Sequence, residues 1–497
     1  MWDDSPKINT TYYFEFVANG GVKPINLITA SFDGQPVNLS LIIVSPSSIF
    51  PSKSVNISTY KGTYDYGAVL YASLLFYESQ RSGRLPSNKR ISWRGDSMLN
   101  DRGKNGEDLT GGYFAQDSNF YKISSQMAVF TSTLAWGVID YEDAYVKAGQ
   151  LEYVRDAIRW STDYLMKAHV EDYELYEYVG DVYSYGSTSD RWSRPEDSSQ
   201  PRPTLKLNIK NCSVFVPGEV AATLAAASIV FRLSDHVYES KLIRHAKQLY
   251  IYATSCASGH LIFTSSDGGY ALTWASMWLF YATREQNYLL NAKKYYTEHI
   301  TEESPSNIYQ QYIRRVEIQV LMAKITTEEK YRESVQRSCD HILRVSSKTS
   351  TGLAYFNGNN ALKSTVDMAF VVLQAGAIGV NRDNYFNFTN RQIGYILGDS
   401  GRSFVVGVGQ NYPRRPTDQA SSCPALPATC NQLAYYNPNP NPYLLVGALV
   451  SGSSFDDWDY KDDRTETSGK NIVSVENNAG FQSAVAGLLH YQIKVEK

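Results

Sequence analysis

Apolar residues recur with helical spacing along most of the chain from about residue 63 onward. Val69, Ala72 and Phe76 stand at positions i, i+3 and i+7, and the same pattern runs from Leu151 to Leu165. Loops rich in Gly, Pro, Ser and Asn separate these segments. The pattern predicts helices over 66–82, 126–142, 150–169, 218–233, 240–254, 270–283, 286–300, 310–325, 328–345, 362–378, 385–397 and 477–493.

Twelve helices in six pairs are what an (α/α)6 barrel requires, so the predicted fold class is mainly α. The inner helices of such a barrel are apolar on more than one face. The run Ala221–Ala227 fits an inner helix, because its small residues let neighbouring helices approach closely. A helical solenoid would also contain paired helices, but no fixed period of repeat length is present.

Residues 1–62 have a different pattern, with short β-rich runs in place of helical periodicity. The runs are 11–17, 24–28 and 37–44, and Gly20–Gly21 lies between the first two. We expect a small N-terminal β element over 1–62 and a helical barrel over 63–497. Short exposed strands are candidates for edge pairing, which predicts self-association or a contact with another extracellular protein.

Composition excludes several classes of protein. The chain is 43% hydrophobic and 20% charged, which is ordinary for a soluble globular protein. A net charge of −3 and the lack of long Lys/Arg runs argue against a nucleic-acid partner. No run of about 18 apolar residues exists, so no membrane span is expected.

The loop Trp93–Met127 and the segment Ser474–Leu488 carry a family resemblance. The loop begins WRGDSMLN and continues through NGEDLTGGY, and the later segment contains NAGF. Together they resemble glycoside hydrolase family 9, the inverting endoglucanases, and the resemblance runs from Tyr64 to the C-terminus. It implies an (α/α)6 barrel and a cleft in which two carboxyl groups act on a β-glucan.

The resemblance places the catalytic base in an Asp-Ala-Gly-Asp segment. An alignment anchored on Lys122 puts its two aspartates at Gln116 and Asn119. A register shifted by one residue also finds no carboxylate at either position. Asp117 is the nearest acid, and it could serve only if the loop were rebuilt by about one residue.

The other family positions are also changed. The proton donor falls on Ile472, and the cleft histidines that follow Arg-Pro fall on Thr417 and Asp418. From these replacements we expect a protein without cellulase activity. No cofactor and no metal are expected, because the sequence has no CxxC motif or Cys/His cluster. The alternative is an active endoglucanase with relocated carboxylates, of which Asp117 and Glu476 are the leading candidates.

Some polar and aromatic residues of the family pattern persist. Tyr113, Trp192, Arg194 and Tyr412 are expected to line the remaining groove, where rings could stack on the sugars of a β-glucan. For any one aromatic residue, ordinary core packing is the commoner role.

The chain has five cysteines. Cys423 and Cys430 flank a proline-rich loop and could form a short disulfide, or remain separate thiols. The other three, Cys212, Cys256 and Cys339, lie in or beside helical surroundings and are expected to be buried thiols.

Glycosylation sequons suggest secretion, since three of them fall within the first sixty residues. A signal peptide is presumed to have been removed from this sequence, because the first residues lack a basic start and an apolar run. The candidate acceptors are Asn9, Asn38, Asn56, Asn211 and Asn387.

Three functions are therefore considered. The first is an inactive, extracellular structural or assembly component that uses the barrel as a rigid block and residues 1–62 as a connector. The second is a pseudoenzyme that binds β-glucan in the groove without cutting it. The third is the endoglucanase with relocated carboxylates.

Overall fold

The computed structural model shows a chain that divides into two compact units, Met1–Lys53 and Ser54–Lys497. In the first unit, strands β1 (Ser31–Phe32) and β2 (Gln35–Pro36) pair antiparallel. The three β-rich runs expected between residues 11 and 44 lie outside the described residues. Described are residues 31–32, 35–36, 64–115, 120–182, 192–258, 266–300, 309–356, 360–453 and 456–495.

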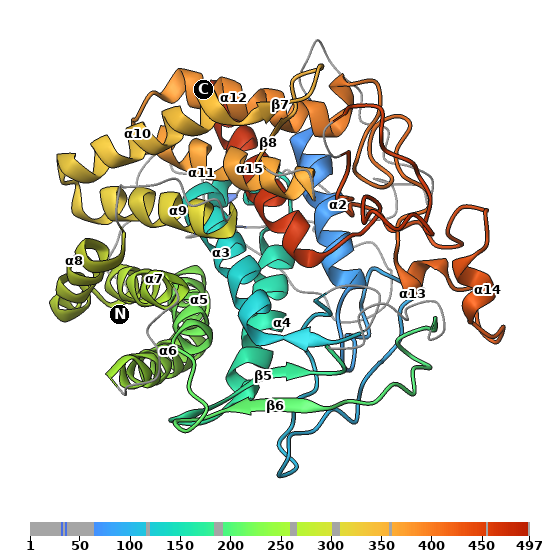
Figure 1. The fold of residues 1–497 in the computed structure, drawn as a ribbon, viewed down its shortest axis with the longest axis horizontal. Coiled ribbons are helices and arrows are strands. Elements are labelled where there is room, and N and C mark those ends of the chain that lie inside the picture. The colour runs from blue at the N-terminus through green and yellow to red at the C-terminus, as the bar shows by residue number, and fades with distance from the viewer. Residues whose placement is uncertain are drawn as a thin grey trace. The chain divides into compact units, whose positions relative to one another are not determined.

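Twelve long helices among the described residues of the second unit form two concentric rings (Figure 1). Each inner helix contacts the next, and the last contacts the first, so the inner ring is closed. The inner helices are α3 (Ser124–Lys147), α5 (Phe215–Phe231), α7 (Ser266–Thr283), α9 (Tyr309–Thr326), α11 (Ala361–Ala377) and α15 (Val475–Val495). The outer helices, each packed on an inner one, are α2 (Tyr66–Ser79), α4 (Leu151–Ala168), α6 (His236–Ser258), α8 (Gln286–His299), α10 (Glu329–Val345) and α12 (Arg382–Gly394).

The position of a helix in the rings follows from its apolar pattern. Helix α5 is buried on every side from Val216 to Ser228, because it is surrounded by helices. Helix α4 buries only a stripe that includes Val154, Ile158 and Leu165, and its other face is polar. The prediction of a mainly α protein with an (α/α)6 barrel is confirmed, and each predicted helix is present with its ends moved by a few residues.

Aromatic side chains fill the middle of the inner ring. The rings of Trp136, Trp274 and Trp278 lie with centroids 5.5–5.9 Å apart, and Phe370 lies 5.6 Å from Trp136. Trp136, Trp274 and Trp278 are at most 1% exposed. These residues close the interior of the barrel below its entrance.

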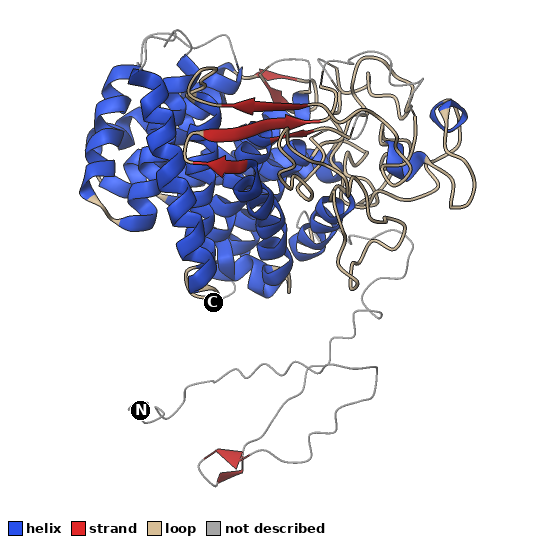
Figure 2. Cartoon of the chain, turned by 90° about the horizontal axis from the view of Figure 1, so that it is seen from below, coloured by secondary structure: helices blue, strands red, loops and turns tan. Residues whose placement is uncertain are grey.

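A small antiparallel sheet lies across the end of the barrel at which the inner helices begin (Figure 2). In it β5 pairs with each of the other three strands, and the last residue of β3 directly precedes α3. The strands are β3 (Lys122–Ile123), β4 (His169–Glu171), β5 (Glu174–Val179) and β6 (Thr204–Leu207).

Short elements occupy the remaining loops at this end. They are the strand pair β7 (Ser347–Lys348) and β8 (Ala354–Tyr355), the π-helical turn η2 (Tyr395–Asp399), and the one-turn helices α13 (Gln419–Ser422) and α14 (Gln432–Tyr435). None of the helices among the described residues is long and apolar enough to span a membrane.

The described residues contain two disulfides, one within a loop and one between a loop and helix α6. Cys423 and Cys430 are joined, with Cα atoms 5.3 Å apart, as their flanking prolines suggested. Cys212 and Cys256 are also joined, with Cα atoms 5.7 Å apart. The expectation of buried thiols is therefore wrong for this second pair, because the fold brings together residues 44 positions apart. Cys339 is a free, buried thiol.

Removal of the longer bridge should destabilise the protein. The Cys212–Cys256 disulfide closes a loop of 44 residues, and the loop-entropy relation assigns such a bridge about 4 kcal/mol. We expect Cys256→Ser to lower the free energy of unfolding by about 2–4 kcal/mol, measured by denaturant titration under non-reducing conditions. The matched control Cys339→Ser removes a thiol that closes no loop. An equal loss in both variants would show that the bridge adds nothing.

Candidate active site

The mouth of the barrel is the end at which α3, α5, α7, α9, α11 and α15 begin. Long loops reach this end from residues 80–123, 192–214 and 400–474. The family resemblance places its cleft among these loops. The side chains there fall into three groups: those that hold the loops, those that form the loop edge at Thr417 and Ile472, and the charged groups in the first turns of the inner helices.

Arg94 holds the loop that carries the resemblance. Its side chain is 2% exposed, its Nε lies 2.8 Å from Oε1 of Glu196, and it also donates to the carbonyls of Ser79 and Arg81. The backbone N–H of Gly95 donates to the same Glu196 oxygen at 2.8 Å. Arg94 is therefore an internal support of the loop.

A buried ion triad fixes the next part of the same loop. Asp101 accepts from Arg202 at 2.7 and 2.9 Å and lies 2.8 Å from Nζ of Lys122. Asp101 and Lys122 are at most 1% exposed. Although burial alone would raise the pKa of Asp101, Arg202 and Lys122 hold it below its usual value. Burial lowers the pKa of Lys122 to about 8, against the attraction of Asp101.

The segment aligned with the catalytic base follows this triad. Gln116, Asp117 and Asn119 lie outside the described residues, so their expected roles stay predictions. The described residues on either side are buried: Ala115 is 8% exposed and Phe120 is 1% exposed. The N–H of Ala115 donates to the carbonyl of Tyr121 at 3.0 Å, so the residues that flank the segment 116–119 lie side by side.

The structure brings the two other altered family positions together. Thr417 and Ile472 form a parallel β-bridge, and the N–H of Thr417 donates to the carbonyl of Asn471 at 2.9 Å. Asp418 is 1% exposed; it caps α13 by accepting from the N–H of Ser421 at 2.6 Å. Asp418 therefore has a structural role, because its carboxylate oxygens accept hydrogen bonds from Ser421 and Gln80.

Glu476 lies in the first turn of α15, four residues after Ile472. Its side chain is 29% exposed, and its Oε1 lies 3.2 Å from Nζ of Lys363 on α11. Lys363 also pairs with Asp367 at 2.7 Å. Although burial lowers the pKa of Lys363, the two carboxylates raise it above its ordinary value. Glu476 is therefore a partly exposed acidic side chain that Lys363 holds in place.

A second charged chain continues across the mouth. Arg314 on α9 pairs with Glu219 of α5 at 2.9 Å and with Glu317 of its own helix at 3.0 Å. Its guanidinium also lies over the ring of Trp274, 4.7 Å from the centroid, which joins the charged groups to the aromatic interior below. We call Glu219, Arg314, Glu317, Lys363, Asp367 and Glu476 the mouth cluster.

Glu317 is a largely buried carboxyl group of the mouth cluster with a raised pKa. Its side chain is 12% exposed. Burial raises its pKa to about 7; Arg314 and Lys363 oppose this shift, and the charges of Asp367 and Glu219 add to it. No pattern in the sequence pointed to Glu317, because its burial and the charges of Glu219 and Asp367 come from the packing of helices far apart in the chain.

The raised pKa predicts a pH-dependent stability. A carboxyl whose folded-state pKa exceeds its unfolded value of 4.5 favours the folded state at low pH, and this contribution is lost as pH rises towards 7. We expect Glu317→Gln to gain stability relative to wild type between pH 4.5 and 7.5, measured by denaturant titration at each pH. Glu329→Gln, at an exposed residue of α10, is the control. A constant difference between Glu317→Gln and wild type would contradict the assignment.

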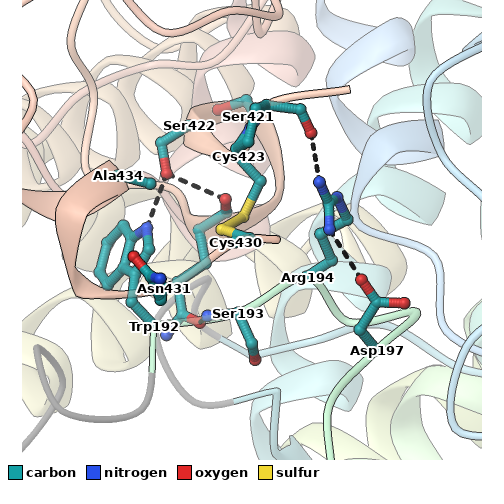
Figure 3. Close-up of a disulfide and its surroundings, with 12 residues drawn as sticks. Trp192, Ser193, Arg194, Asp197, Ser421, Ser422, Cys423, Cys430, Asn431 and Ala434 are labelled. Atoms are coloured by element: carbon teal, nitrogen blue, oxygen red, sulfur yellow. Dashed lines mark hydrogen bonds and ion pairs between the residues drawn. A yellow bond between two sulfur atoms is a disulfide. The ribbon is translucent and has the colours of Figure 1, made fainter. Parts of the chain in front are cut away.

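Trp192 and Arg194 are buried among the loops around the Cys423–Cys430 disulfide (Figure 3). The indole N–H of Trp192 donates to Oγ of Ser422 at 2.9 Å, and Arg194 pairs with Asp197 at 2.8 Å. Trp192 is 3% exposed and Arg194 is 6% exposed. The expectation that they line a sugar groove is corrected, because neither side chain presents a free face.

Tyr113 is likewise a core residue. It is 1% exposed, its hydroxyl donates to the carbonyl of Ala157 at 3.1 Å, and its ring packs edge-on against Tyr77 and Phe130. Tyr412 is the remaining glycan-binding candidate, and its side chain is partly exposed on the loop before Thr417. Its sugar contact stays a prediction.

Comparisons with known proteins agree with this architecture. A family model described as glycosyl hydrolase family 9 matches residues 66–485. Endoglucanase 14 of Arabidopsis thaliana is 35% identical over 446 residues, which cover 81% of this chain and 89% of that protein. The solved endoglucanase of the termite Nasutitermes takasagoensis is 41% identical with a TM-score of 0.80, covering 86% of this chain and 100% of that one. Endoglucanase CelQ of Clostridium thermocellum, solved with cellotriose, is 26% identical with a TM-score of 0.74, covering 86% of this chain and 71% of CelQ.

These relatives contradict the expectation of a protein without enzymatic activity. They are endoglucanases, and the similarity covers more than four fifths of this chain. That expectation equated the loss of acids at aligned positions with the loss of catalysis. Proton transfer requires a carboxyl within reach of the scissile bond, and neighbouring positions can supply one. Asp117 lies between the two aligned base positions, and Glu476 lies four residues after Ile472 in the chain.

Proposed function

The chain belongs to glycosyl hydrolase family 9, and on that premise we propose that it is an endoglucanase that hydrolyses β-1,4-linked glucans. The observation that carries the proposal is the similarity to endoglucanases at 35–41% identity over more than four fifths of the chain. A β-glucan is the proposed substrate, because CelQ was solved with cellotriose bound.

We propose that Asp117 and Glu476 supply the two carboxyl groups. An inverting hydrolase needs an acid that protonates the leaving glycosidic oxygen and a base that takes a proton from the attacking water. Glu476 lies on the donor side of the family pattern, close to Ile472, and Asp117 lies in the base segment. In this assignment the carboxyl of Glu476 gives its proton to the leaving oxygen. Water attacks the anomeric carbon as its proton passes to Asp117.

The mouth cluster fixes the position of the Glu476 side chain. Lys363 fixes the carboxylate from one side, and Asp367 holds Lys363 in turn at 2.7 Å. Glu476 also remains partly exposed, as a group that touches substrate must be, whereas Asp418 is buried and capping a helix. Among the described acids nearest to the altered family positions, Glu476 therefore fits best.

Hydrolysis of cellopentaose tests the proposal. Proton NMR should show shorter cello-oligosaccharides, with the new reducing ends released first as the α-anomer, because a single displacement inverts the β-linkage. Products released first as the β-anomer would contradict the inverting assignment. Unchanged cellopentaose after prolonged incubation would contradict the proposed function.

We also propose that the protein is secreted. Its two disulfides support this location, since such bonds persist in oxidising compartments. Of the candidate glycosylation sites, Asn211 and Asn387 are exposed, and Asn9, Asn38 and Asn56 lie outside the described residues. A contact with other proteins through residues 1–62 stays a prediction.

A further inference from the structure

A basic pocket lies on the outer wall of the barrel, between α4, α6 and the loop at residues 110–112. It has a volume of about 570 Å³. Its lining consists of Arg84, Thr110, Gly111, Gly112, Trp160, Asp163, Tyr164, Met166, Lys167, Lys241, Arg244 and His245. A second depression, of about 600 Å³, adjoins it along α6 and shares Lys241 and Arg244 with it. We call the two together the wall pocket.

The charge of the wall pocket is positive. Arg84, Lys241 and Arg244 are exposed and form no ion pair with a carboxylate of the described residues. Lys167 is paired with Asp108, 2.9 Å away. Three cations that line the same pocket therefore remain to attract an anion.

The titratable groups around these cations leave the balance positive. Asp163 is the carboxylate in the lining, and it accepts from the hydroxyl of Tyr238 at 2.6 Å. His245 contributes little charge, because burial lowers its pKa and the nearby Arg244 lowers it further. His245 also shares a hydrogen bond with His169, with their Nδ1 atoms 2.9 Å apart, which requires one of the two rings to be an acceptor.

The pocket also offers apolar and backbone surface to a ligand. Trp160 is partly exposed; its indole N–H donates to the carbonyl of Gly112 at 3.0 Å, and the guanidinium of Arg81 lies over its ring, 4.8 Å from the centroid, so the exposed part of the ring is what a ligand can contact. Met166 adds a partly buried thioether. At Gly111 an added Cβ would meet nothing within 4 Å, so the backbone is open to close approach. Aromatic surface with a few charged groups suits a sugar that carries an acid.

We propose that the wall pocket binds an oxyanion carried on a saccharide, namely the carboxylate of a uronic-acid unit in an acidic polysaccharide. The same oxyanion chemistry is offered by free inorganic phosphate. The volume favours the saccharide, because a space of several hundred Å³ is the size of ligand pockets and exceeds the needs of a single inorganic ion. The residues proposed for hydrolysis do not line it, so the inference stands apart from the proposed activity.

Calorimetry with three probes tests the inference: a tetramer of galacturonic acid, neutral cellotetraose and inorganic phosphate. The double variant Lys241→Ala/Arg244→Gln should weaken binding of the acidic tetramer by roughly five- to thirtyfold, since each exposed cation contributes about 0.5–1 kcal/mol. The matched control Lys294→Ala/Arg344→Gln changes an exposed lysine and an exposed arginine on α8 and α10 and should leave binding unchanged.

The outcomes separate the two sources of the oxyanion and separate this site from the mouth. Tighter binding of the acidic tetramer than of phosphate, lost in the pocket variant, supports the proposal. Equal affinity for both, or an equal loss in the control variant, overturns it. Hydrolysis of a neutral soluble cellulose should be the same in the pocket variant and wild type. The binding of the acidic tetramer can be measured even if the protein hydrolyses no cellulose, so the two proposals are tested separately.

Discussion

Glu476→Gln is expected to lower kcat/KM on soluble cellulose by about 10²- to 10⁴-fold, the usual effect of losing one general acid or base. The amide has nearly the shape of the carboxyl but cannot deliver a proton to the leaving oxygen. Lys363 keeps its second partner, Asp367, at 2.7 Å, so the local structure should persist. The measurement is the initial rate of reducing-end release over a range of substrate concentrations.

A control at the same end of the barrel makes this result specific. Glu466→Gln changes a partly exposed acid in the loop before Ile472 and should keep the wild-type rate. A substrate with a good leaving group, such as an aryl cellobioside, should be affected less by Glu476→Gln than cellulose is, because it needs little protonation. Equal losses on both substrates would assign Glu476 a role other than proton donation.

Asp101→Asn should be the most destabilising single change in the loop that leads to the base segment. It leaves Lys122, which is fully buried, without its counter-charge and deprives Arg202 of its carboxylate. Breaking a buried ion pair from one side costs about 3–5 kcal/mol. Denaturant titration at neutral pH measures this loss directly.

The same triad predicts how stability changes with acid. Arg202 and Lys122 hold the folded-state pKa of Asp101 below its ordinary value of 3.8. A lowered folded pKa gives stability that is present above the unfolded value and is lost as pH falls through the folded one. Asp101→Asn should therefore differ from wild type less at pH 2 than at pH 7.

The exposed aspartate in the same loop provides the comparison. Asp108 is 52% exposed and pairs with Lys167 and Arg102 at 2.9 and 3.5 Å. Such surface pairs contribute about 0–1 kcal/mol, so Asp108→Asn should change stability little. A loss at Asp108 as large as that at Asp101 would contradict the distinction between buried and exposed pairs.

The helical part of the fold could be predicted because each helix has its own local spacing of apolar residues. The spacing of Val154, Ile158 and Leu165 is enough to place α4 and its buried face. The strands β5 and β6 escaped prediction, because they are short and each is stabilised by a partner distant in sequence. Strand pairing is a tertiary property, and a short segment does not encode it alone.

The candidate site was only partly accessible to sequence reasoning. Motifs led to Glu476 and to the loop edge at Thr417 and Ile472, which the structure does bring together. Burial could not be predicted from the motifs. Trp192 is a residue type that often stacks on sugars, but here its indole N–H donates to Ser422 and its ring packs against Tyr435 inside the loop region. Glu317 was missed because its raised pKa arises mainly from burial, which depends on how the helices pack and is not visible in the sequence.

We propose that this barrel cuts β-glucan with relocated carboxylates. The most direct test is the rate of reducing-end release from soluble cellulose by wild type and by Asp117→Asn/Glu476→Gln, purified identically. We expect a measurable rate for wild type and only background for the double variant. Equal rates, whether both high or both at background, would contradict it.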